Sequence, residues 1–106
     1  MARTLISVPP NPKPGEVIEL RATIAHPMET GLRQESPGLV APRNILTFFT
    51  CKLDGVTVFS AELYPAVAAN PLLAFSLKAE RSGTLTFTWE GDNGFSQTET
   101  VPLRVA

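Results

Sequence analysis

The sequence contains one cysteine, one histidine and no long hydrophobic run, and each shortage excludes a class of protein. With Cys51 alone, neither an intramolecular disulfide nor a cysteine-rich zinc site can form. With His26 alone, a blue-copper site or a multi-histidine iron site cannot be built within one chain. No run approaches the roughly eighteen apolar residues that a membrane-spanning helix needs. The sequence therefore predicts no metal site and no cofactor.

Charge of one sign is also scarce. Nine Lys and Arg residues stand against ten Asp and Glu residues, and the basic residues are not clustered. Nucleic acid and anionic membrane surfaces are therefore disfavoured as partners. The N-terminal stretch MARTLISVPPNPKPG has a short apolar segment that prolines interrupt, which is not typical of a secretory signal. Taken alone, these features predict a soluble chain that is not exported.

A hydrophobic fraction of 43% and a length of 106 residues predict one globular domain that spans residues 1–106. Residues 16–25 alternate between apolar and polar, and so do residues 84–89, as expected for half-buried strands. The segments expected to be strands are 3–8, 16–25, 45–53, 56–63, 72–79, 84–89 and 95–105. With turn residues between them and no convincing helix, they predict an all-β fold, an immunoglobulin-like antiparallel β-sandwich of about seven strands.

The strongest local signal is a hairpin around Asp54-Gly55, which lies between two β-rich runs. This dipeptide suits a type I′ turn, because that turn needs a positive φ at both central residues. A two-residue loop places Leu53 opposite Val56, and regular pairing then places Cys51 opposite Val58 and Thr50 opposite Phe59.

With this register the hairpin is apolar on both faces. One face carries Ile45, Phe49, Cys51, Leu53, Val56 and Val58, and the other carries Leu46, Phe48, Phe59, Ala61 and Leu63. A sheet with one solvated face is normally polar on that face. Two explanations stay open: the long irregular segment 26–44 folds over the second face, or a partner protein covers it.

Catalytic arrangements are not supported by the sequence. A Ser-His-Asp or Cys-His arrangement would have to use His26, and no G-x-S-x-G motif is present. Cys51 lies within an expected strand, where a buried hydrophobic role is the more common one. The acidic residues are scattered over turns and polar strand faces. The chain is therefore predicted not to be an enzyme.

The segment HPMETG at 26–31 gathers His26, Met28 and Glu29 next to the long irregular stretch. A two-coordinate Cu(I) site formed by His26 and Met28 is chemically possible. The other hypothesis is that His26 and Glu29 order the adjoining loop or contact a partner.

Several segments together resemble one family. HPMETG at 26–31, Pro42-Arg43 before the TFFTC strand, YPAVAANP at 64–71 and SGTLTFTWEGDNG at 82–94 resemble the SoxZ family of the bacterial sulfur-oxidation (Sox) system. The likeness extends over nearly the whole chain. It implies an immunoglobulin-like sandwich that forms a heterodimer with SoxY, whose mobile C-terminal arm carries the substrate on a cysteine.

The resemblance implies a non-catalytic subunit, since this chain ends in TVPLRVA and its one cysteine lies in a strand. It also implies transient contacts with SoxAX, SoxB and SoxCD, and a periplasmic location reached by export together with SoxY. We expect the interface to include Phe48, Phe59, His26, Met28 and Glu29. The alternatives are a small Cu(I)-binding sandwich that uses His26 and Met28, or a generic immunoglobulin-like interaction module.

Overall fold

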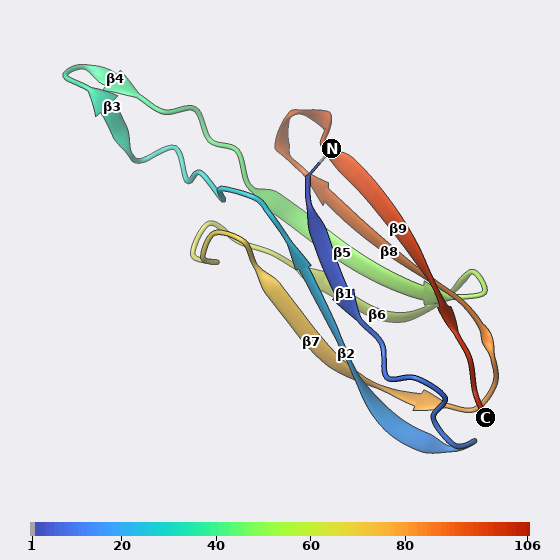
Figure 1. Ribbon diagram of the computed structural model, residues 1–106. Coiled ribbons are helices and arrows are strands. Elements are labelled where there is room, and N and C mark those ends of the chain that lie inside the picture. The colour runs from blue at the N-terminus through green and yellow to red at the C-terminus, as the bar shows by residue number, and fades with distance from the viewer. Residues whose placement is uncertain (1) are drawn as a thin grey trace.

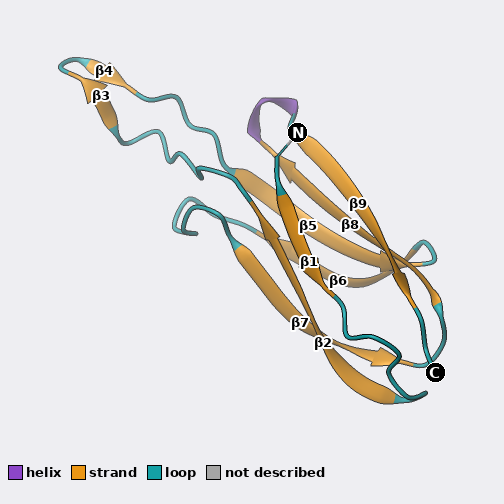
Figure 2. Cartoon of the chain, in the orientation of Figure 1, coloured by secondary structure: helices purple, strands orange, loops and turns teal. Residues whose placement is uncertain are grey.

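The computed structural model describes residues 2–106, which form nine strands in two main sheets and one small ribbon (Figures 1 and 2). One sheet has the order β1-β2-β7 and the other the order β6-β5-β8-β9. All pairings between neighbouring strands are antiparallel. The bounds are β1 Thr4–Ser7, β2 Glu16–Ile24, β3 Gln34–Ser36, β4 Leu39–Val40, β5 Leu46–Leu53, β6 Val56–Glu62, β7 Leu72–Ala79, β8 Gly83–Gly91 and β9 Ser96–Leu103.

The core lies between the two main sheets and is formed by the alternating faces that the sequence predicts. Ile18, Leu20, Ala22 and Ile24 of β2 are buried, and so are Leu85, Phe87 and Trp89 of β8. Phe49 of β5 lies at the centre, where its ring contacts four aromatic rings with centroids 5.3 to 6.3 Å away. The predicted immunoglobulin-like sandwich is confirmed, and its seven strands are β1, β2 and β5 to β9.

The β5–β6 hairpin has the predicted turn but not the predicted register. Asp54 and Gly55 have φ values of 48° and 83°, as a type I′ turn requires. The predicted pairings of Cys51 with Val58 and of Thr50 with Phe59 are wrong, because the register shifts between Cys51 and Lys52. The structure pairs Cys51 with Phe59 and Thr50 with Ser60. One extra residue in one strand moves every later side chain to the other face of the sheet.

This shift moves Phe59 to the core side of the sheet. Its ring stacks on Phe75 of the opposite sheet, with centroids 4.2 Å apart, and also contacts Phe49. Phe48 lies on the outer face, where it pairs with Glu62 and Glu90. The prediction of a hairpin that is apolar on both faces is therefore wrong.

The segment 26–44 does not fold over that outer face. Residues 29–44 form an arm that projects beyond one end of the sandwich and carries β3 and β4 near its tip (Figure 1). The arm contributes to an elongated outline of 58 × 20 × 20 Å. In residues 2–106 no helix has the length and hydropathy that crossing a membrane requires.

Candidate interaction site at the root of the arm

The chain leaves the sandwich after β2 at His26, which is buried. Its backbone is held by Asn70 of the 64–71 connection: the His26 N–H donates to Asn70 Oδ1 at 3.0 Å, and the Asn70 N–H donates to the His26 carbonyl at 2.7 Å. Phe95 packs edge-on against the imidazole, with centroids 5.6 Å apart. His26 thus joins three segments that are far apart in the sequence.

The imidazole of His26 works as a hydrogen-bond acceptor. Its Nδ1 accepts the backbone N–H of Met28 at 3.0 Å, so the neutral tautomer carries its proton on Nε2. Burial lowers the pKa of His26 below the ordinary 6.5, and the negative charge of Asp92 opposes this shift more weakly. Both the geometry and the surroundings therefore favour the uncharged ring.

Met28 is buried and takes a left-handed backbone conformation, with φ of 50°. Its Sδ accepts the N–H of Leu46 at 3.2 Å, which ties the outgoing chain to the start of β5. A Cu(I) ion bound by Met28 Sδ and His26 Nδ1 would have to replace two hydrogen bonds to buried backbone groups. Leaving buried N–H groups without a partner is costly. The geometry therefore disfavours a Cu(I) site that uses these two atoms.

Glu29 closes the root of the arm. Its backbone forms an isolated bridge with Asn44, with N···O distances of 2.8 and 2.7 Å. Its carboxylate accepts two hydrogen bonds from the Arg33 guanidinium, at 2.9 and 2.7 Å. The prediction that His26 and Glu29 order the adjoining loop agrees with these contacts, whereas their role at an interface stays a prediction.

Asp92, in the turn after β8, is a residue of the root that the sequence did not reveal. Its carboxylate accepts two hydrogen bonds from Arg43, at 2.8 and 3.2 Å, and one from the Ile45 N–H at 3.0 Å. These donors hold the pKa of Asp92 below its ordinary value. The contact needs glycine at position 91, because a Cβ there would lie 2.6 Å from the Ile45 carbonyl oxygen.

The structure therefore brings His26, Met28 and Glu29 together, but not with the two phenylalanines. Phe48 and Phe59 lie on β5 and β6, on opposite faces of the four-stranded sheet. Their interface role stays a prediction, and the surroundings of Phe59 already give it a role in the core.

The single thiol lies in the sandwich core, where Cys51 pairs with Phe59. Cys51 is fully buried among core residues, and burial raises its pKa to about 11. A thiol rather than a thiolate is present at neutral pH, and the thiolate is the reactive form. Cys51 thus has neither the exposure nor the ionisation that a covalent carrier needs.

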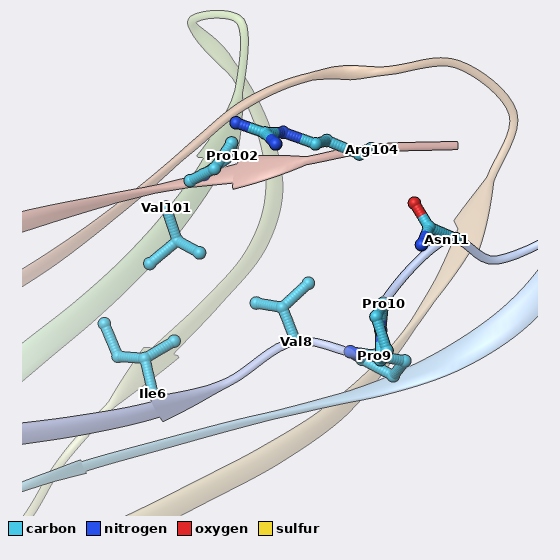
Figure 3. A pocket seen from close by; sticks show the side chains of 8 residues that line it. All are labelled: Ile6, Val8, Pro9, Pro10, Asn11, Val101, Pro102 and Arg104. Atoms are coloured by element: carbon cyan, nitrogen blue, oxygen red, sulfur yellow. The ribbon is translucent and has the colours of Figure 1, made fainter. Parts of the chain in front are cut away.

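A second surface lies between the edge strands β1 and β9, which belong to different sheets. Figure 3 shows Ile6, Val8 and Val101 pointing toward one another across a depression of about 460 Å³. Its rim carries Pro9, Pro10 and Pro102. Proline has no N–H to donate to an added strand, so Pro102 disfavours β-pairing along β9, and Pro9 and Pro10 disfavour it beyond the end of β1.

Residues 2–106 contain no group of three or more His, Cys, Asp and Glu side chains arranged to hold a metal ion.

Solved structures with a similar fold include superoxide reductase (neelaredoxin) from Ignicoccus hospitalis. It is 17% identical over 99% of this chain and 82% of that chain, with a TM-score of 0.73. Two variants of the same protein are also 17% identical, cover 97 and 99% of this chain and 79 and 81% of those chains, and give TM-scores of 0.73 and 0.74. Identity this low shows a shared fold, and the fold does not carry the activity with it.

No curated protein matches this chain in sequence. A family model does match, and its description is "Sulphur oxidation protein SoxZ". The match covers residues 6–102, which include both main sheets, the arm and its root almost entirely. The chain therefore belongs to the SoxZ family, and its role lies in sulfur oxidation as a component of the Sox system.

Proposed function

We propose that this chain is the non-catalytic subunit of a SoxYZ-type carrier, which binds SoxY and helps to present the substrate on the SoxY cysteine to the Sox enzymes. The observation that carries the proposal is the SoxZ family match over residues 6–102. Transient contacts with SoxAX, SoxB and SoxCD belong to the same proposal.

The chemistry of Cys51 supports this division of labour. A subunit that carried sulfur covalently would need an exposed thiol with a thiolate fraction at neutral pH. Cys51 is fully buried and its pKa is about 11. The reactive thiol of the carrier must then be supplied by the other subunit.

We also propose that the protein works in the periplasm, and that it is exported already folded together with SoxY. A fold that is stabilised by a packed core and has one buried cysteine requires no oxidative step before export. Fractionation of cells that express this chain with SoxY, or with SoxY lacking its signal sequence, tests the location. Periplasmic recovery that depends on that signal sequence is expected, and recovery without it would contradict joint export.

The binding proposal is tested by co-expression with a tagged SoxY-type subunit. We expect affinity purification to recover both chains and light scattering to give the mass of a one-to-one complex. Mass spectrometry after exposure to thiosulfate and the Sox enzymes should find the sulfur adduct on the partner cysteine and leave Cys51 unmodified. Recovery of the tagged subunit alone, or an adduct on Cys51, would contradict the proposal.

A further inference from the structure

The arm is the part of the molecule that packs least against the rest of the chain. Residues 32–40 are all exposed. They include Leu32, Leu39 and Val40, with 86%, 55% and 49% of their surface accessible. An isolated two-stranded ribbon is marginally stable in water, because it has no hydrophobic face to bury. A second body that covers the arm would both shield these side chains and stabilise the ribbon.

The arm is nevertheless held firmly where it leaves the sandwich. The outgoing and returning segments of the arm are joined at the root by the Glu29–Asn44 bridge. Arg43 pairs with Asp92 of the sandwich. The Ala41 N–H donates to the Arg33 carbonyl at 2.8 Å and continues the ribbon toward its tip. Because the root is fixed before binding, less conformational entropy is lost when a partner engages the tip.

The charges of the arm limit the kind of partner. Residues 29–44 contain two acidic and two basic side chains, Glu29, Glu35, Arg33 and Arg43, which sum to zero. All four take part in ion pairs, at distances of 2.7 to 3.7 Å. An arm with no net charge, whose charged side chains are all paired, offers little attraction to nucleic acid or an anionic membrane. The contact must then depend on apolar surface.

The placement of the apolar residues limits the shape of the partner. Leu39 and Val40 are consecutive in β4, and consecutive strand residues point to opposite faces. Burying both therefore requires a partner that contacts both faces of the ribbon, which a groove does and a flat surface does not. The edge between β1 and β9 carries prolines and is a poorer docking site for an added strand.

We propose that the arm is the element that engages the SoxY-type subunit, by inserting the β3–β4 ribbon into an apolar groove of that subunit with Leu39 and Val40 as anchors. This inference rests on the proposed function and goes beyond it by assigning the docking surface. The arm binds the partner through this insertion, and the fixed root at Asp92 and Glu29 sets the direction in which the arm projects.

The test compares two double variants in calorimetric titration against the SoxY-type subunit. In the arm variant Leu39→Asp and Val40→Asp are combined, and in the control Leu5→Asp and Val17→Asp are combined on β1 and β2. The control positions are matched in kind, since Leu5 and Val17 are also exposed apolar residues, at 75% and 65%. We expect the arm variant to raise the Kd at least about 30-fold, as loss of a hot spot does, and the control to change it less than about threefold.

Three results of this titration separate the outcomes. Unchanged thermal unfolding of both variants shows that the fold is intact, as exposed positions predict, and a 30-fold loss in the arm variant then supports the proposal. Equal affinity of arm variant and control overturns the arm proposal and leaves the proposed function standing. A wild-type chain that does not bind the SoxY-type subunit at all overturns the proposed function itself.

Two further measurements test which molecule occupies the arm and which forces hold it. If light scattering shows that the isolated wild-type chain is a dimer and the arm variant a monomer, a second copy occupies the arm and the proposal is overturned. A Kd that changes little between 50 and about 500 mM salt is expected for apolar contact, and a steep salt dependence would contradict it.

Discussion

The sandwich and the arm are stabilised in opposite ways. In the sandwich, aromatic rings from both sheets surround Phe49, and a continuous cluster of apolar side chains is buried between the sheets. In the arm, the root is held by hydrogen bonds and ion pairs, and the apolar side chains of Leu32, Leu39 and Val40 face water. The difference shows that the sandwich is stabilised by its own core, whereas the arm leaves apolar side chains exposed that the proposed partner would cover.

The largest expected effect tests the sandwich. Phe59→Ala should lower the free energy of unfolding by about 2 to 4 kcal/mol, because its ring stacks on Phe75 and contacts Phe49. The matched variant Phe48→Ala, on the outer face of the same hairpin, should cost less than about 1 kcal/mol. Urea unfolding of the two variants measures both values.

Equal losses for the two variants would show that the hairpin register is not the one that places Phe59 in the core. Titration of Phe48→Ala with the SoxY-type subunit also tests the interface role predicted for that residue. Weakened binding with unchanged unfolding would extend the docking surface from the arm to the outer face of the sheet.

A smaller effect is expected from protonation of His26 at the root. Because its folded pKa lies below the unfolded 6.5, its contribution to stability is fully present above pH 6.5 and is lost as the pH falls toward the folded pKa. Thermal unfolding should therefore be level from about pH 8 to 6.5 and decline below it. NMR titration of the imidazole gives the pKa directly.

The control for this prediction is His26→Asn, whose side-chain oxygen can accept the Met28 N–H without titrating in this range. The variant should show a smaller decline between pH 6.5 and 5. Asp92 does not interfere, because its pKa is lowered from 3.8 and its own contribution is lost only at still more acid pH. An NMR pKa above 6.5 would contradict the buried, neutral ring.

The smallest effect on global stability is expected at Asp92. Asp92→Asn removes the charge that pairs with Arg43 on an exposed surface, where such pairs contribute little to unfolding. Locally, the amides of Glu29 and Asn44 should exchange faster with solvent, because the root loses one of its ties. Hydrogen-exchange NMR separates the two readouts, with core amides of β8 as the reference. Faster exchange throughout the sandwich would show that the Asp92 contact stabilises the sandwich as well as the arm, and would contradict the difference between the two regions.

Much of the sandwich was predictable from short-range patterns. The alternation in β2 and β8 identified both the strands and the residues that face the core, because side chains in a strand alternate with a period of two. The Asp54-Gly55 pair identified the turn, because few residues accept positive φ. HPMETG drew attention to the root of the arm, although the hydrogen bonds to Asn70 and Leu46 involve residues distant in the sequence.

The remaining features depend on contacts between distant segments. The bulge after Cys51 has no recognisable pattern in the local sequence, because it depends on the stacking of Phe59 on Phe75 of the opposite sheet. In the sequence Asp92 resembles any turn residue, because its partners Arg43 and Ile45 lie next to it only in the folded chain.

The sequence by itself thus determined the seven strands of the sandwich, the buried faces of β2 and β8 and the membership in a family. Only the tertiary structure decided the hairpin register and the projection of the arm, because both result from packing and hydrogen bonding between residues far apart in the chain.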